Sequence, residues 1–414
     1  MIRLDILKYL LPLFLISPML TLGGFGLTIA EILTFFTGIV FLMGFKGTIK
    51  FPAILILFIF LIVVGRIGAF VNSLDYNIPF NYAKIVFLFI IFVQVISYSI
   101  GRYSKITFDE IIVSGFAKVL FSVLAVFSLI YIVSDFDTRV RLLTLFFPKG
   151  MDFVRFNSPR FPGLGINANI YSFIVFMFLV MSVRTYLENK SNFLIPFLCT
   201  VIIFSITSKT TIIVSMIALL FFSIYYYSKK TSDNLTKKKA TRIITTLILI
   251  GFIIITASIV FSEYIIIFQR FDELLGNSEN VNSLNDRFEL WNLGIERIKM
   301  APFFGIDVVQ ANLVSDTRPI YFATPHNEFL FYWMSLGIAG LLAYSILLIY
   351  LVWINLFPKI RIEWIIIYSA LIIQMFFDGA FQTLRFQFIF FIFLGLNFRE
   401  LAIERTKDYD FKLQ

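Results

Sequence analysis

Long apolar runs separated by short polar intervals make up most of this chain. A helix needs about 20 apolar residues to cross roughly 30 Å of hydrocarbon. About twelve runs approach that length, near residues 6–22, 25–45, 51–71, 82–100, 108–134, 166–187, 192–207, 210–228, 243–262, 327–353, 362–378 and 384–400. The pattern predicts an all-α, polytopic membrane protein with about twelve transmembrane helices.

The first apolar run follows a short basic start at Arg3 and Lys8. A secretory signal peptide has the same beginning, but a small-residue cleavage site would have to follow it. The sequence contains no such site after the run, and further apolar runs come next. We therefore expect residues 6–22 to form a retained first span.

Composition agrees with a membrane protein and excludes several other classes. Of the 414 residues, 59% are hydrophobic and 15% are charged, whereas a soluble domain is roughly half apolar and a quarter charged. The net charge of +9 does not require a nucleic-acid partner, because membrane proteins concentrate Lys and Arg in their cytoplasmic loops. Cys199 is the single cysteine, so an intramolecular disulfide and a cysteine metal cluster are both excluded.

The distribution of basic residues orients the predicted spans. The densest group comprises Lys229, Lys230, Lys237, Lys238, Lys239 and Arg242. By the positive-inside rule this group is cytoplasmic, and so are both termini. Two long loops, about 135–165 and 262–326, then lie on the outer side. We expect one integral-membrane domain over residues 1–414.

The second outer loop, about 262–326, contains a predicted amphipathic helix near 285–300. Its apolar positions recur close to a helical period among charged residues, at Leu284, Phe288, Trp291, Leu293, Ile295 and Ile298. Asn285 or Asp286 can cap the start of this helix, and Pro302 lies just beyond its end. We expect the helix to lie across the outer membrane surface with its apolar stripe facing down.

Candidate chemistry gathers on the same predicted side of the membrane. The only histidine, His326, lies where the polar loop meets an apolar run, and Arg160, Lys209 and Arg287 lie in other outer segments. Guanidinium and ammonium groups suit phosphate oxygens, and fixed positive charge lowers the barrier when a diphosphate leaves. A histidine can then activate an acceptor hydroxyl as a base at neutral pH.

Simpler interpretations of these residues stay open. The outer basic residues can be solvated loop charges, and His326 can be a helix-terminal residue whose ring nitrogens are satisfied locally. Asp135 and Asp137 form an Asp-x-Asp pair, a spacing that some glycosyltransferases use for a metal ion, but a solvated helix end is the simpler interpretation and we expect no metal there.

Four short motifs together give the chain a family resemblance. They are Arg160-Phe-Pro-Gly-Leu-Gly-Ile-Asn-Ala-Asn169, Thr207-Ser-Lys-Thr-Thr211, Arg287-x-x-Leu-Trp291 with Pro302-x-x-Gly305, and His326-Asn-Glu-Phe-Leu330 with Gly337-x-x-Gly340. In order, spacing and membrane placement they resemble the O-antigen ligase and O-antigen polymerase superfamily. The resemblance covers most of the chain from about residue 155 to 341.

The resemblance implies an integral-membrane glycosyltransferase with a GT-C-like helical bundle. Its donor and acceptor would be oligosaccharides linked to undecaprenyl diphosphate, and it implies no metal or other cofactor. Arg160 and Arg287 would contact the diphosphate, with Lys209 and Asn327 beside them, and His326 would activate the acceptor. The superfamily usually has arginine where this chain has Lys209, and lysine keeps the charge but loses the guanidinium fork.

Within the superfamily we favour the polymerase, which extends a lipid-linked repeat unit at its non-reducing end. The alternative is the ligase, which transfers the finished glycan to lipid A-core. A transporter or flippase of lipid-linked oligosaccharide is the alternative from another class, and it predicts a pseudo-symmetric chain. Membrane lipid surrounds the protein in each case, and a chain-length regulator protein is a candidate partner of the polymerase.

Overall fold

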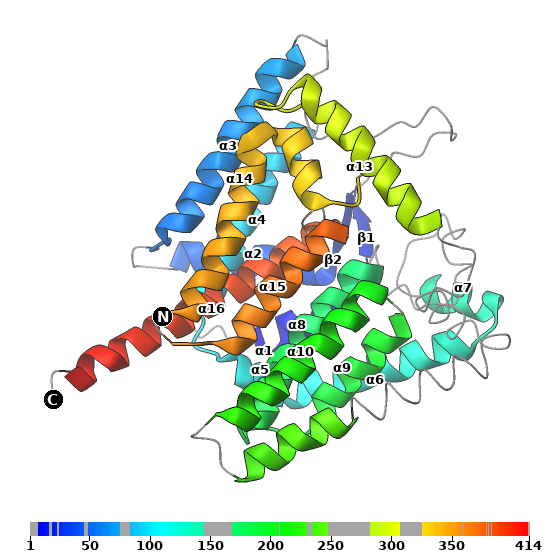
Figure 1. Cartoon of the computed structure of the whole chain (residues 1–414), viewed down its shortest axis with the longest axis vertical. Coiled ribbons are helices and arrows are strands. Elements are labelled where there is room, and N and C mark those ends of the chain that lie inside the picture. Colours follow the sequence, from blue (N-terminus) through cyan, green and yellow to red (C-terminus); the bar gives the residue numbers. More distant parts are fainter. Residues whose placement is uncertain are drawn as a thin grey trace. The chain divides into compact units, whose positions relative to one another are not determined.

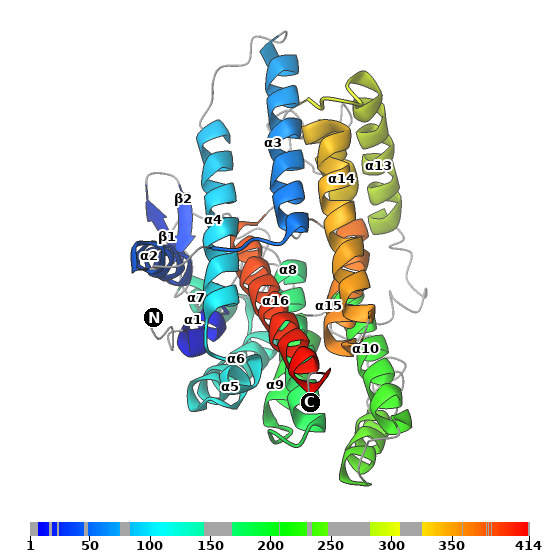
Figure 2. The same ribbon diagram turned by 90° about the vertical axis from the view of Figure 1, so that its left-hand side faces the viewer.

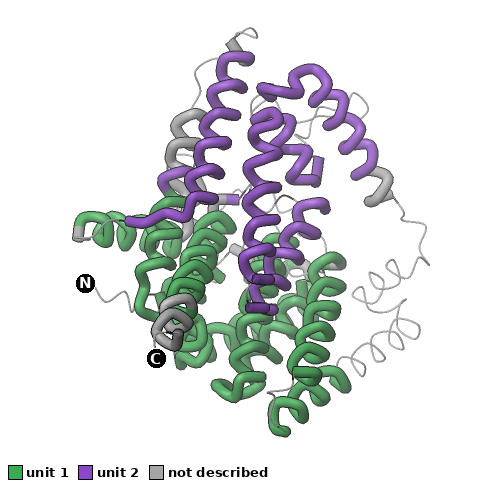
Figure 3. Tube along the Cα trace, turned by 60° about the vertical axis from the view of Figure 1, so that its left-hand side comes forward, with its two compact units in different colours: residues 1–46, 93–277, 385–414 green, residues 47–92, 278–384 purple. Residues whose placement is uncertain are grey.

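The computed structural model describes most of the chain (Figure 1). The described residues are 7–15, 19–22, 25–44, 49–74, 83–144, 168–206, 208–229, 234–246, 282–306, 325–357, 359–377, 379, 381 and 383–412. The chain divides into two compact units (Figure 3). Unit 1 comprises residues 1–46, 93–277 and 385–414, and unit 2 comprises residues 47–92 and 278–384.

Unit 1 is built around a helix that is buried along its whole length. This helix is α8 (Ala168–Leu187), which packs against α5 (Phe108–Val113), α9 (Leu194–Ile206) and α10 (Lys209–Ser228). A helix that is apolar on every side belongs in an interior. The remaining elements of the unit are α1 (Leu7–Leu13), β1 (Met19–Leu22), β2 (Phe25–Thr28), α2 (Ile29–Gly44), α6 (Gly115–Val133), α7 (Phe136–Thr144) and α16 (Leu384–Lys412), of which α16 belongs to it from Arg385 onward.

Unit 2 is built around α14 (Glu328–Leu356). This helix packs against α3 (Ala53–Leu74), α13 (Asn282–Met300) and α15 (Ile362–Phe377), and Figure 2 shows α3 and α13 on either side of it. Glycine permits the close approach of α3, since a Cβ on Gly65 would lie 2.7 Å from the carbonyl oxygen of Leu336. One further helix, α4 (Ala83–Tyr103), runs from residues of unit 2 into residues of unit 1.

The helices confirm an all-α, multi-pass membrane protein. Within the described ranges, 6 helices are long and apolar enough to cross a membrane. They contain residues 53–72, 115–133, 168–187, 210–228, 328–356 and 385–404, and three shorter apolar helices cover 29–43, 194–206 and 362–377. The β1–β2 hairpin is the one sheet in this part of the chain.

The expected first span at residues 6–22 is wrong. Residues 7–13 form the short helix α1, which contains Pro12, and β1 then pairs antiparallel with β2, with Leu22 opposite Phe25. Proline removes a helical hydrogen bond and clashes with the preceding turn, so it ends or kinks a helix. A two-residue connection is typical of a hairpin, and the sequence between the strands is Gly23-Gly24.

The expected span at 108–134 is two helices rather than one. Thr107 and Glu110 form a capping box at the start of α5. Ser114 then ends α5 and begins α6, because its hydroxyl donates to the carbonyl of Ile111 and accepts from the N–H of Ala117. The expected span at 243–262 lies mostly outside the described residues, as do most of the two long loops at 135–165 and 262–326.

A network of ion pairs joins three segments at one end of unit 1. Asp109 binds Arg184 at 3.3 Å and Lys190 at 2.6 Å, and Arg184 also lies 3.5 Å from Glu400. Burial raises the pKa of Asp109, but Arg184 and Lys190 outweigh this effect and hold the pKa below its ordinary value.

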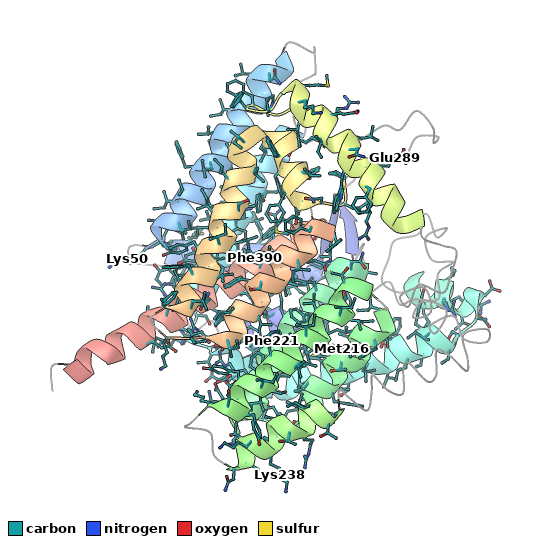
Figure 4. The ribbon with its side chains drawn as sticks, in the orientation of Figure 1. Lys50, Met216, Phe221, Lys238, Glu289 and Phe390 are labelled. Carbon is teal, nitrogen blue, oxygen red and sulfur yellow. The ribbon has the colours of Figure 1, made fainter. Side chains whose placement is uncertain are left out.

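The same end of unit 1 receives the basic segment at residues 234–246. Lys239 donates to the carbonyl of Tyr186 at 2.8 Å, and Lys238 projects as an exposed side chain (Figure 4). Arg399 donates to the carbonyls of Lys105 and Ile106. The fold therefore brings together segments that the positive-inside rule assigns to one side of the membrane.

Candidate functional site

A joint made of main-chain atoms connects the end of α13 to the middle of α14. Residues 301–306 turn directly after α13, and Gly305 and Gly337 both have positive φ values, +73° and +65°. A Cβ on Gly337 would lie 2.1 Å from the carbonyl oxygen of Phe303, and a Cβ on Gly305 would lie 2.5 Å from the nitrogen of Gly337. Both positions therefore require glycine.

Hydrogen bonds across the joint hold it in register. The N–H of Ile306 donates to the carbonyl of Met334 at 2.8 Å, and the N–H of Ile338 donates to the carbonyl of Pro302 at 3.1 Å. The indole of Trp333 donates to the same carbonyl at 3.0 Å. The Pro302-x-x-Gly305 and Gly337-x-x-Gly340 motifs thus form two halves of one structural feature, which fixes α13 against α14.

His326 and Asn327 lie at the start of α14. Asn327 is the N-cap of this helix, and its buried side chain accepts a hydrogen bond from the N–H of Leu330 at 3.1 Å. His326 is half-buried, and its backbone is in the left-handed region, with φ +47°. Non-glycine residues are uncommon in that region and cluster at functional sites. Helix α14 therefore starts directly after Asn327, where the predicted apolar run at 327–353 begins.

One face of α13 lies against the segment that carries His326. Gly294 is buried, and a Cβ on it would lie 3.6 Å from both the Pro325 Cβ and the Met334 sulfur. Arg287 precedes Gly294 by seven residues, which is close to two full turns, so both lie on the same face about 10 Å apart along the axis. Arg287 is half-buried, whereas Glu289 on the same helix is exposed (Figure 4).

Trp291 lies on the same face of α13, between Arg287 and Gly294. Its indole nitrogen is buried, and no hydrogen-bond partner for it is found among the residues that the structure describes. The ring packs edge-on against Phe288, with centroids 5.4 Å apart. The helix begins at Asn282, three residues before the expected cap at Asn285.

The other two predicted diphosphate ligands belong to unit 1. Lys209 is the first residue of α10. Arg160 lies outside the described residues. Two residues after Lys209, the hydroxyl of Thr211 lies 2.7 Å from that of Ser172 in α8, so the start of α10 meets the helix that follows the Arg160 motif in the sequence. His326 and Arg287 share unit 2, and Lys209 is in unit 1.

The structure also shows polar residues that the sequence analysis missed. Asn72 of α3 donates from its side-chain amide to the carbonyl of Gly305 at 2.7 Å, which ties a third helix to the joint. In unit 1, buried Arg385 lies 3.9 Å from buried Glu31. Asn72 and Arg385 are polar residues near the ends of apolar runs, and this position in the sequence could have identified them as candidates for buried polar contacts.

Asp135 caps a helix in this structure. It precedes α7 and accepts a hydrogen bond from the N–H of Thr138 at 2.7 Å, and this bond lowers its pKa. Asp137 lies in the first turn of the same helix, where a negative charge is favourable. In the described part of the chain, no three His, Cys, Asp or Glu side chains gather where they could hold a metal ion.

Comparison with known proteins finds one family whose model matches part of the chain. A family model described as O-antigen ligase matches residues 194–345. This part of the chain is similar to the O-antigen ligase and polymerase superfamily. The match supports a glycosyltransferase that acts on lipid-linked oligosaccharide in a membrane. No curated protein matched the chain.

The O-antigen ligase match covers just over a third of the chain and includes the joint described above. It begins at Leu194, the first residue of α9, and ends within α14. Lys209, Arg287 and His326 all fall inside it, and Arg160 falls outside. The resemblance inferred from the motifs is confirmed for the superfamily, and the choice between ligase and polymerase is a matter of proposal.

Proposed function

We propose that the protein is an O-antigen polymerase. It transfers a glycan from an undecaprenyl-diphosphate carrier to the non-reducing end of a lipid-linked repeat unit, on the periplasmic side of the bacterial inner membrane. The observation that supports this proposal is the contact of Gly294 with Pro325, because Arg287 lies on the same helix as Gly294, His326 follows Pro325, and all four residues belong to one compact unit.

The proposed reaction is one displacement at the donor's anomeric carbon. A ring nitrogen of His326 takes the proton from the acceptor hydroxyl, and the hydroxyl oxygen forms a bond to the anomeric carbon. The bond between that carbon and the diphosphate oxygen breaks, and undecaprenyl diphosphate leaves with the electron pair. One displacement inverts the anomeric configuration. The imidazolium then releases its proton to solvent, which restores the base.

Positive groups assist the departure of the diphosphate. Arg287 lies about 10 Å along α13 from the contact with Pro325, an interval that an arginine side chain and a diphosphate can bridge together. Its planar fork can bind two phosphate oxygens at once. We assign Asn327, which lies in the same unit, to this diphosphate, and Arg160 and Lys209 stay predictions from the sequence. Charge develops on the leaving group in the transition state, so these contacts lower the barrier.

Supplying one acceptor at a time, first the lipid-linked repeat unit and then lipid A-core, distinguishes polymerase activity from ligase activity. Purified full-length protein in nanodiscs is incubated with undecaprenyl-diphosphate-linked repeat units alone, and then with added lipid A-core. A ladder of longer lipid-linked glycans in the first reaction supports the polymerase. Glycan found only on lipid A-core would replace it with the ligase. Absence of any new glycosidic bond in both reactions would overturn the transferase proposal.

The base is tested by His326→Ala and His326→Gln. Glutamine keeps hydrogen-bonding capacity without basicity, so both variants are expected to lose roughly 100-fold or more in transfer rate, within the range that general bases contribute. Insertion into the membrane and the thermal unfolding midpoint serve as controls for folding. A normal glycan ladder from either variant would remove His326 from the mechanism.

A further inference from the structure

A groove runs along α14 beside α15, within unit 2. We call it the α14–α15 groove; its lining includes Asn327, Leu341 and Leu348 of α14 and Ile372 and Phe376 of α15. Its volume is about 400 Å³, within the range of about 300–1,000 Å³ that is usual for ligand sites. Both halves of α14, before and after the bend at Gly337, contribute to the walls.

The walls are apolar and fixed in place. Phe329 packs against Phe376 with ring centroids 4.9 Å apart, which joins the two helices at the end near Asn327. Trp333 also lines the groove, and its indole is held by the hydrogen bond to the carbonyl of Pro302. The main-chain joint therefore sets the position of one wall. Asn327 and Ser345 are the polar residues among those that line the groove.

The groove is accessible from the lipid-facing surface of these helices. Ile349 is 64% exposed and Phe376 is 45% exposed, and both line the groove. They belong to α14, which is long enough to span the membrane, and to the shorter apolar helix α15. A lipid chain can therefore enter from the bilayer without crossing a polar barrier.

We propose that the α14–α15 groove binds the prenyl chain of the lipid-diphosphate carrier. This inference rests on the proposed function, because the groove ends at Asn327, next to the proposed base His326. A carrier whose diphosphate lies at that end would extend its chain along the groove. Lipid tails are as apolar as leucine, so a chain gains little hydrophobic energy on leaving the bilayer. The groove contributes shape and van der Waals contact, which position the head group.

Two matched pairs of neighbouring residues test the groove by substitution. Leu341 lines the groove, whereas its neighbour Leu342 does not and is 41% exposed. Ile372 lines it, whereas its neighbour Ile373 does not and is 44% exposed. Leu341→Trp and Ile372→Trp add an indole that fills the groove. Their controls, Leu342→Trp and Ile373→Trp, add the same indole to the outer surface of the same helices.

The groove-filling variants are expected to raise the KM for the lipid-linked donor about tenfold, which corresponds to about 1.4 kcal/mol. The surface variants are expected to keep the KM of the unmodified protein. The thermal unfolding midpoint of each variant shows whether it has folded. Equal KM values within both pairs, in folded protein, would overturn the groove assignment.

A photolabelling experiment tests the occupant without relying on transfer. The probe is a farnesyl diphosphate analogue with a diazirine in its last isoprene unit, added to unmodified protein in nanodiscs. Labelled peptides are located by mass spectrometry and are expected to contain residues 333–341 or 372–376, because the extended probe spans about 20 Å from Asn327 at about 1.5 Å per helical residue. Undecaprenyl diphosphate should displace the probe, and phosphatidylglycerol at the same concentration should not.

The outcomes separate this inference from the proposed function. Labelling elsewhere in a protein that transfers glycan would overturn the groove and leave the transferase proposal intact. Labelling in the groove that phosphatidylglycerol displaces equally well would identify an ordinary bilayer-lipid site and overturn the proposed occupant. Specific prenyl labelling in a protein that forms no glycosidic bond would support the groove and remove the transferase proposal.

Discussion

Gly337→Ala is expected to destabilise the joint between α13 and α14. The backbone of Gly337 has φ 65° and ψ −162°, a region that is nearly exclusive to glycine and costs other residues about 1–3 kcal/mol. The added Cβ would also lie 2.1 Å from the carbonyl oxygen of Phe303, and such overpacking costs about 1–3 kcal/mol. Together these terms disfavour the docked joint by about 2–6 kcal/mol, or at least about 30-fold.

Disulfide trapping measures whether α13 stays docked. A Cβ on Gly294 would lie 3.6 Å from the Pro325 Cβ, within the 3.5–4.5 Å typical of disulfides. Cysteines at these two positions should therefore cross-link readily, and the native Cys199 is buried and should not interfere. Adding Gly337→Ala is expected to lower the cross-linking yield sharply, and Gly337→Ala alone should lower glycan transfer.

The matched control for this prediction is Gly115→Ala. A Cβ on Gly115, the first residue of α6, would meet nothing within 4 Å. This change should leave transfer unaffected and stabilise the protein slightly, because alanine restricts the unfolded chain. The reasoning about the joint would be refuted if Gly337→Ala cross-linked and transferred glycan as well as Gly115→Ala does.

The remaining predictions concern α13 and the ion-pair network of unit 1. Gly294→Leu should lower glycan transfer, because its larger side chain would push α13 away from Pro325. Gly294→Ala should be tolerated, because the added Cβ would make only ordinary van der Waals contacts at 3.6 Å. Transfer assays that show the same rate for both variants would contradict this prediction. Arg287→Ala should slow glycan transfer about 10–150-fold from the loss of one charge-assisted contact, and Arg287→Lys should have an intermediate rate. Arg297→Ala on the same helix should transfer glycan as fast as the unmodified protein. Equal transfer rates for all three variants would contradict the role of Arg287. The pKa of Asp109 is lowered by folding, so its stabilisation is present above its unfolded value of about 3.9 and disappears as the pH falls through the lower, folded value. Asp109→Asn should therefore lower the free energy of unfolding by about 1–2 kcal/mol at neutral pH. The variant's unfolding midpoint should also fall less between pH 7 and pH 3 than that of the unmodified protein. An unmodified protein with the same unfolding midpoint at pH 7 and pH 3 would contradict the role of Asp109.

Hydrophobic length predicts most of the fold, because crossing a bilayer constrains composition more strongly than any soluble fold does. The expected runs at 51–71, 166–187 and 327–353 correspond to α3, α8 and α14, with ends that differ by a few residues. The run at 6–22 fails because hydrophobicity alone does not register the helix-breaking effect of Pro12.

The geometry of the candidate site was harder to predict, because it depends on contacts between residues far apart in the chain. The motifs indicated that Gly305 and Gly337 matter, but their spacing does not reveal that the two glycines touch. The contact of Gly294 with Pro325 likewise follows from the way the joint folds α13 back along α14. Asn72, more than 200 residues from Gly305, joins the same feature through one hydrogen bond.

The joint between α13 and α14 has a consequence for how such a protein can diversify. Two of the hydrogen bonds across the joint connect main-chain atoms, which have no rotamers, so these two bonds do not depend on which side chains surround them. Substitutions on the exposed side of α13, around Glu289, can therefore change the surface of this helix while its docking against α14 is kept. The outer surface of α13 and the way the helix docks can therefore evolve separately.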